Sequence, residues 1–213
     1  MLVAAIVTAV AGFVANGWFS KAFSQPLTPT ATHLRLMQPF DLYGKLRAPY
    51  KPGLTLRGGS CLNSSESADA GALRCFNGSH VADPCWQSGN QSRGVDVACL
   101  TLPWDTRVLV IVNPRITAMP GASIAAVPWA MEIIQPGHPR HLLRCGLAGG
   151  TARVIAGMRA NWSCFRPGQE NPSGLAGYAL GTPKIAMSKP WTVFYVPVNG
   201  RRAVETTVTT VWR

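Results

Sequence analysis

Six cysteines are the residues of this 213-residue chain whose type and spacing most clearly predict chemistry. Thirteen residues separate the first two, thirteen the next two and eighteen the last two, in the order Cys61, Cys75, Cys85, Cys99, Cys145 and Cys164. Zinc ligands come in close pairs with about two to four residues between them, whereas the shortest cysteine gap here has nine. An even number of widely spaced cysteines instead predicts disulfide bonds made in an oxidising, extracytoplasmic compartment.

The simplest disulfide pairing is sequential: Cys61–Cys75, Cys85–Cys99 and Cys145–Cys164. The first two pairs depend on the repeated spacing, because six cysteines permit fifteen pairings. The third pair follows because only those two cysteines lie in the C-terminal half. We expect no free thiol and therefore no cysteine nucleophile, and we predict neither a metal site nor a cofactor.

Carboxylates are the other side chains that could act chemically, as an acid–base pair of the kind used in glycoside hydrolysis. Candidates are Glu66, Asp69, Asp83, Asp96, Asp105, Glu132, Glu170 and Glu205. Eight acids always permit some pair, and the chain has no nucleotide-binding, zinc-protease or serine-hydrolase motif. We therefore predict a non-catalytic protein, with a small hydrolase as the alternative.

The charge of the chain points to polyanions. The formal net charge is +11, and residues 106–213 hold twelve Lys or Arg but only three acids. A basic surface attracts polyanions, so the predicted partners are an anionic cell-surface polymer, a membrane surface or an envelope protein, and not nucleic acid. A merely solvated basic surface is the alternative. The candidate contact residues are Arg140, Arg144, Arg153, Arg159, Arg201 and Arg202.

The elements that must position these residues are predicted to be strands. Apolar and β-branched runs bounded by Gly, Pro or Asn occur at 106–113, 128–134, 141–145, 151–155, 161–165, 191–198 and 203–212. Asn77-Gly78 and Asn199-Gly200 predict tight turns. We expect a single, mainly β, antiparallel domain linked by disulfides, with an α+β arrangement as the alternative.

The N-terminal part of the chain differs in composition from the rest. Residues 1–15 are uncharged and almost wholly apolar, so residues 1–24 are predicted to be a signal peptide or a membrane anchor. Residues 25–57 contain several Pro and Thr and predict a flexible spacer. Residues 58–213 then form the extracytoplasmic domain.

Several short segments of that domain resemble, in order, an uncharacterised family of exported proteins from high-GC Gram-positive (actinobacterial) bacteria. They are Gly59-Ser60-Cys61, Arg74-Cys75, Asp83-Pro84-Cys85, Val97-Ala98-Cys99, Pro103-Trp104, Pro128-Trp129-Ala130-Met131-Glu132, Arg144-Cys145, Asn161-Trp162-Ser163-Cys164 and Lys189-Pro190-Trp191-Thr192. The resemblance covers about 58–213 and implies a secreted or membrane-anchored module, without supplying a catalytic residue. Residues 138–143 depart from the pattern, because a tighter acidic-glycine turn is expected there.

Export, basic charge and the lack of catalytic motifs together favour one function. We predict a non-catalytic, secreted or membrane-anchored envelope module that binds an anionic surface polymer or a protein partner. The alternatives are a small cell-envelope hydrolase that uses an Asp/Glu pair and a structural or assembly protein of the envelope.

Overall fold

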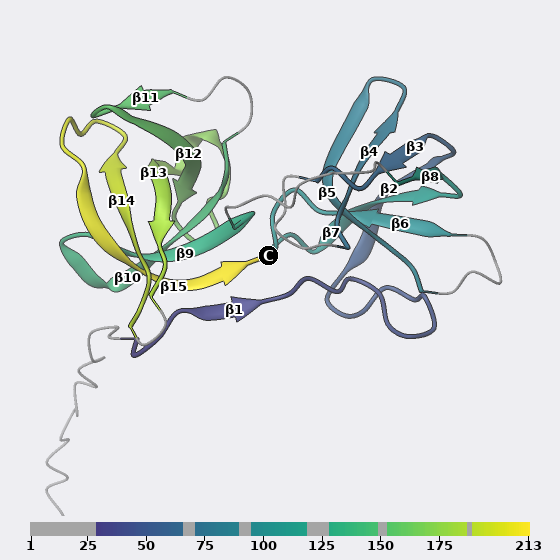
Figure 1. Ribbon diagram of the computed structural model, residues 1–213, viewed down its shortest axis with the longest axis horizontal. Helices are drawn as coiled ribbons and strands as arrows, with labels where there is room; N and C mark the ends of the chain where they lie inside the picture. The colour runs from purple at the N-terminus through teal and green to yellow at the C-terminus, as the bar shows by residue number, and fades with distance from the viewer. Residues whose placement is uncertain (1–28, 66–70, 90–94, 119–127, 149–152, 187–188) are drawn as a thin grey trace, which may run out of the picture.

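The computed structural model describes residues 29–65, 71–89, 95–118, 128–148, 153–186 and 189–213. Within them the regular structure is β, apart from one 3-10 turn, η1 (Pro172–Gly174). The strands form two sheets that lie side by side, and the C-terminus lies at their junction (Figure 1). The predicted mainly β class is confirmed. The α+β alternative would require α-helices, and none occurs among the described residues.

The first sheet closes into a barrel of six antiparallel strands that follow one another along the chain. Its strands are β9 (Ala130–Gln135), β10 (His138–Leu147), β12 (Met158–Phe165), β13 (Leu175–Lys184), β14 (Thr192–Pro197) and β15 (Val204–Trp212). Each pairs with the next, and β15 pairs back with β9, from Val208 opposite Ile133 to Trp212 opposite Ala130. Closure pairs both edges of the sheet, so the barrel strands expose no long open edge.

Two short strands extend the barrel. Strand β11 (Val154–Ile155) forms a hairpin with β12, and β1 (His33–Arg35) lies parallel to the last residues of β15. Strand β1 thereby ties a segment from early in the chain to its C-terminal strand.

The barrel interior is filled by alternate side chains of its strands, because successive residues of a strand face opposite sides. Met131, Ile133, Trp162 and Val193 are among its buried residues. Trp162 is fully buried, and its indole Nε1 donates a hydrogen bond of 3.0 Å to the carbonyl of Pro128. A buried Trp needs such an acceptor, so this bond fixes the ring inside the barrel.

The second sheet has the order β2-β7-β6-β5-β4-β3-β8. Its strands are β2 (Lys51–Arg57), β3 (Ser60–Leu62), β4 (Leu73–Asn77), β5 (His80–Gln87), β6 (Asp96–Cys99), β7 (Arg107–Val112) and β8 (Arg115–Thr117). Only Gly58-Gly59 separates β2 from β3, and only Asn113-Pro114 separates β7 from β8. Yet β2 pairs with β7 at one edge while β3 pairs with β8 at the other. The segment that contains β2 and β3 and the segment that contains β7 and β8 therefore each contribute to both ends of the sheet, which requires the sheet to curl.

The bend between β2 and β3 requires glycine. Gly59 has a φ of 90°, and a Cβ atom there would lie 2.4 Å from the carbonyl oxygen of Phe76. Both the positive φ and the close approach favour glycine at this position.

The three disulfides pair as predicted: Cys61–Cys75, Cys85–Cys99 and Cys145–Cys164. Each joins residues directly opposite one another on antiparallel neighbours, with Cα atoms 3.9 to 4.0 Å apart. The sulfurs of Cys75, Cys85 and Cys99 all lie within 4.8 Å of one another. They belong to two neighbouring disulfides and offer no thiolate, the form that binds metal.

A buried cluster between the two sheets joins them into a common core. Trp86 of the second sheet lies 5.5 Å from Trp129, measured between ring centroids. Val108 and Val110 of β7 and Trp212 of the barrel belong to the same cluster. The faces of the two sheets that meet here are therefore apolar, as shared burial requires.

The flexible spacer predicted for residues 25–57 is wrong for the part that the structure describes. Strands β1 and β2 pair within the two sheets, and Met37 is buried in the cluster between them. Thr32 Oγ1 donates to the carbonyl of Val208 and accepts from the backbone N–H of Trp191, both at 2.7 Å. The spacer was predicted from the Pro and Thr residues of this segment. The segment also contains alternating sequences such as His33-Leu34-Arg35-Leu36, which are typical of strands. The folded part thus begins before residue 58, and residues 1–24 lie outside the described residues.

Each strand predicted for the C-terminal half has a counterpart in the structure, although that at 151–155 is only Val154–Ile155 among the described residues, and β8 and β13 were missed. The sequence of β13 contains Gly177, Gly181 and Pro183, which favour turns. A Cβ atom at Gly177 would lie 2.2 Å from the carbonyl oxygen of Val196, so packing excludes a larger side chain. The departing segment 138–143 forms the start of β10.

Candidate functional site

A pocket of about 420 Å³ lies at the junction of the two sheets. It is lined by the segment between β1 and β2, by the loop between β6 and β7, and by barrel residues of β9, β10 and β15. The side chains with chemical character among its lining residues are Arg35, Arg47, Tyr50, Trp104, Glu132, Arg144 and Trp212.

Aromatic rings form one part of this pocket. Trp104 comes from the loop between β6 and β7, and its ring meets that of Trp212 edge-on, with centroids 5.7 Å apart. The indole Nε1 of Trp104 is buried and has no hydrogen-bond acceptor in the structure. A buried N–H without an acceptor costs free energy.

Three arginines line the pocket together with the aromatic rings, and two of them lie against a ring. The guanidinium of Arg35 lies 5.7 Å from the ring centroid of Trp212, and that of Arg144 lies 5.4 Å from Trp104. Arg35 and Arg47 are exposed and form no salt bridge with a described acid. The lining contains one acid, Glu132. Guanidinium groups bind carboxylates and phosphates through two parallel hydrogen bonds, and aromatic faces bind sugar rings.

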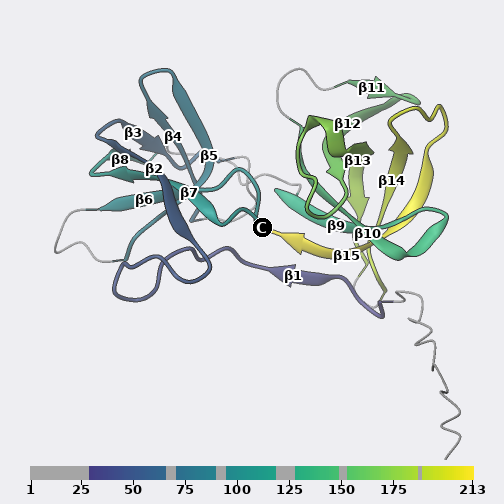
Figure 2. The same ribbon diagram turned by 180° about the vertical axis from the view of Figure 1, so that it is seen from behind.

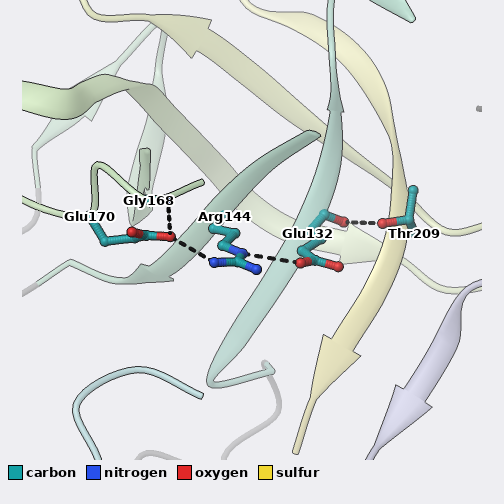
Figure 3. A network of polar contacts seen from close by, with 5 residues as sticks. All are labelled: Glu132, Arg144, Gly168, Glu170 and Thr209. Carbon is teal, nitrogen blue, oxygen red and sulfur yellow. Dashed lines mark hydrogen bonds and ion pairs between the residues drawn. The ribbon is translucent and has the colours of Figure 1, made fainter. Parts of the chain in front are cut away.

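Arg144 differs from the other two arginines because carboxylates hold it. Its Nε lies 3.3 Å from Glu132 Oε1 and its Nη1 lies 2.9 Å from Glu170 Oε1. Arg144 and Glu132 are directly opposite each other on β10 and β9, so the strand register itself creates this pair. Figure 3 shows Arg144 between the two carboxylates, with the backbone N–H of Gly168 donating to Glu170 at 3.0 Å.

Two carboxyl groups beside this network have pKa values displaced in opposite directions. Partial burial opposes ionisation of Glu170, but hydrogen bonds from Arg144 and from the backbone outweigh it, so its pKa lies below the ordinary value. Burial raises the pKa of Asp105, a backbone hydrogen bond at Leu102 lowers it, and the charge of Glu170 raises it further; the net shift is upward. Carboxyl groups displaced in this way can serve as acid and base.

The structure does not gather the six predicted contact arginines into one surface. Arg144 is engaged by Glu132 and Glu170 and is not available as a free cation. The other five lie on three hairpins. Arg140 is on β10, Arg153 and Arg159 flank the β11–β12 turn, and Arg201 and Arg202 lie between β14 and β15. All five are exposed, and Arg153 also contacts the ring and hydroxyl of Tyr178.

Sequence reasoning missed four pocket residues: Arg35, Arg47, Tyr50 and Trp212. Three of them lie in the presumed spacer, and the fourth reaches the pocket only because β15 crosses the barrel towards the junction of the sheets. The alternation of apolar and cationic residues at 33–36 could have marked β1 as a strand.

The carboxylates of the hydrolase alternative are mostly committed to other roles. Asp83 accepts from Arg74 at 2.7 Å, and Glu205 accepts from Lys184 at 2.7 Å. Glu132 and Glu170 share Arg144. Glu66 and Asp69 lie outside the described residues.

Comparisons with protein-family models, with curated proteins and with solved structures find no match. The resemblance to exported actinobacterial proteins therefore stays a prediction. Three buried disulfides indicate an oxidising, extracytoplasmic environment. Among the described residues, no helix has the length and apolar character needed to span a membrane.

Proposed function

We propose that this protein is a non-catalytic binding module of the cell envelope, secreted or membrane-anchored, that binds an anionic surface polymer at the junction of its two sheets. The observation that carries the proposal is the pocket of about 420 Å³ in which three arginines and three aromatic side chains accompany a single acid. This combination suits a polymer whose sugar or polyol units carry carboxylate or phosphate groups.

Different pocket residues would contact different groups of the polymer. Arg35 and Arg47 are exposed and supply guanidinium groups for the anion. Trp104 and Trp212 supply apolar faces. Arg144, held by Glu132 and Glu170, keeps its guanidinium beside Trp104 and stabilises the wall of the pocket.

The test compares two double variants that remove equal charge. Arg35→Gln with Arg47→Gln removes the cations of the pocket, whereas Arg201→Gln with Arg202→Gln removes two exposed cations from the hairpin between β14 and β15. Binding to polygalacturonate and to polyphosphate is measured by calorimetry, with neutral dextran as the ligand control. The pocket variant is expected to weaken binding at least about tenfold, because a hydrogen bond to a charged group contributes about 1.5–3 kcal/mol.

The hairpin variant is expected to bind almost as well as the unaltered protein. Equal weakening by both variants would mean that diffuse charge, and not the pocket, attracts the polymer. No binding to either polyanion at low salt would contradict the proposal.

A hydrolase is a second candidate, favoured by the opposite pKa displacements of Asp105 and Glu170. In that case Asp105, whose pKa is raised, would donate a proton, and Glu170, ionised in its pair with Arg144, would stabilise positive charge that develops on the substrate. Asp105→Asn is then expected to abolish polymer cleavage while leaving binding intact. Cleavage is measured by chromatography of the products. If the unaltered protein cleaves neither polymer, this candidate is excluded.

A further inference from the structure

A loop between β1 and β2 presents two large apolar side chains to solvent. Leu42 is 89% exposed and Tyr43 is 83% exposed. They are adjacent in the chain and occupy the tip of the loop, defined here as the Leu42 loop, residues 40–46. Two such side chains side by side at a tip form an apolar surface that a partner can cover.

The Leu42 loop is held in this shape by its own hydrogen bonds. Asp41 Oδ1 accepts from the backbone N–H groups of Tyr43 and Lys45, both at 2.9 Å. The N–H of Asp41 donates to the carbonyl of Lys45 at 2.8 Å. Gly44 has a φ of 76°, which favours glycine. The tip is therefore a defined turn, so little conformational freedom is lost when it binds.

The base of the loop is anchored in the protein core. Phe40 and Leu46 form an isolated β-bridge, and both pack against the cluster between the two sheets. Tyr50 and the buried Met37 belong to the same packing. The core thus absorbs the apolar residues at the base of the loop, while Leu42 and Tyr43 point away from it.

Exposed cations flank the exposed pair along the chain. Lys45 and Arg47 follow it in the chain and are exposed, as is Arg35. The single acid of the loop, Asp41, has one carboxylate oxygen engaged by the turn. Leu34 and Leu36, 51% and 66% exposed, add apolar surface. Figures 1 and 2 show the chain from β1 to β2 running along one side of the molecule, beneath both sheets.

We propose that the Leu42 loop docks on an anionic lipid surface, with Leu42 and Tyr43 inserted at the level of the headgroups. Leucine and tyrosine with flanking basic residues are the side chains that bind at membrane interfaces. Basic residues near such a surface are attracted by anionic lipid. The pocket that is proposed to bind the polymer shares Arg35 and Arg47 with this side of the molecule, so docking would hold that pocket close to the membrane.

The test measures hydroxyl-radical modification of individual side chains in the full-length oxidised chain, quantified by mass spectrometry. The protein is mixed with vesicles of phosphatidylglycerol and phosphatidylcholine, or of phosphatidylcholine alone. The readout reports on the loop itself, so it does not depend on how residues 1–24 bind lipid. Modification of Leu42 and Tyr43 is expected to fall about tenfold on the anionic vesicles and to stay unchanged on neutral ones.

Controls come from other exposed apolar residues of the chain. Val154 and Ile185, 72% and 65% exposed on the barrel, are expected to keep their modification rates. Lys45→Gln is expected to reduce the protection of Leu42 about fivefold, because each basic residue near the surface contributes about that factor. Unchanged modification of Leu42 and Tyr43 on anionic vesicles, or equal protection on neutral ones, would overturn the proposal.

Docking and polymer binding can fail separately. Leu42→Ser with Tyr43→Ser is expected to abolish protection of the remaining loop residues while leaving polygalacturonate and polyphosphate binding unchanged. Loss of both functions in that variant would overturn the assignment of docking to the loop tip. The Arg35→Gln, Arg47→Gln variant is expected to weaken both polymer binding and protection of the loop, because both cations would also face the anionic lipid, so the Leu42→Ser, Tyr43→Ser variant is the one that separates the two functions.

Discussion

Replacing Arg144 by methionine tests the network beside the pocket. The substitution keeps a long, unbranched side chain but removes the cation from Glu132 and Glu170, whose side chains are 19% and 13% exposed. Leaving buried carboxylates unpaired costs about 3–5 kcal/mol where burial is complete. Because the side chain of Arg144 is itself 31% exposed, water replaces part of the lost interaction, and we expect a loss of about 2–3 kcal/mol. For a chain of this size that corresponds to a fall in Tm of roughly 5–10 °C.

The loss should depend on pH in a defined direction. In the unaltered protein the pKa of Glu170 lies below its ordinary value of 4.5, so its pairing stabilises the fold above that pH and is lost as the pH falls through the lowered pKa. In the variant, the unpaired Glu170 carboxylate can relieve its burial by taking up a proton. The difference in the free energy of unfolding is therefore expected to be largest near pH 7 and to shrink below about pH 4.5.

The assay is equilibrium unfolding in urea, followed by tryptophan fluorescence, because guanidinium chloride would screen the ion pairs. Lys184→Met is the matched control, since Lys184 and Glu205 form a pair at 2.7 Å whose side chains are 61% and 45% exposed. The control is expected to lose less than about 1 kcal/mol. If Arg144→Met costs no more than Lys184→Met, or if its cost is the same at pH 4 and pH 7, the argument from the buried network is refuted.

Two further predictions concern packing inside the barrel. Replacing Cys145 and Cys164 together by alanine should cost about 3 kcal/mol, because it opens the one disulfide of the barrel; urea unfolding should show it, and a loss below 1 kcal/mol would contradict it. Gly177→Ala should destabilise the fold by about 1–3 kcal/mol, because its Cβ would lie 2.2 Å from the carbonyl oxygen of Val196. Gly89→Ala, which meets no atom within 4 Å, is the control and should change the unfolding free energy by less than about 0.5 kcal/mol; similar Tm values for the two variants would exclude the proposed clash.

The disulfides and the strands of the C-terminal half, apart from β8 and β13, could be predicted because their signals are local. Cysteines that face each other across a hairpin leave a regular spacing in the sequence, as Cys61–Cys75 and Cys85–Cys99 show. Turn residues such as Asn77-Gly78 report the backbone conformation that they favour. Strand β13 was not predicted because its Gly177 is required by packing against β14, and a glycine gives no local signal of a strand.

The pocket could not be predicted, because residues far apart in the chain form it. Arg35 and Trp212 meet because β1 pairs with β15, in a register that joins two residues 177 positions apart in the chain. Nothing in the sequence around Arg144 distinguishes it from an ordinary surface cation. The pairing of β9 with β10 nevertheless places Glu132 directly opposite it. Composition and spacing by themselves determined the compartment, the β class and the disulfide framework, since each depends on neighbours along the chain. Only the tertiary structure decided which charges are neutralised, which aromatic rings gather and which apolar side chains stay exposed, because those depend on long-range strand pairing.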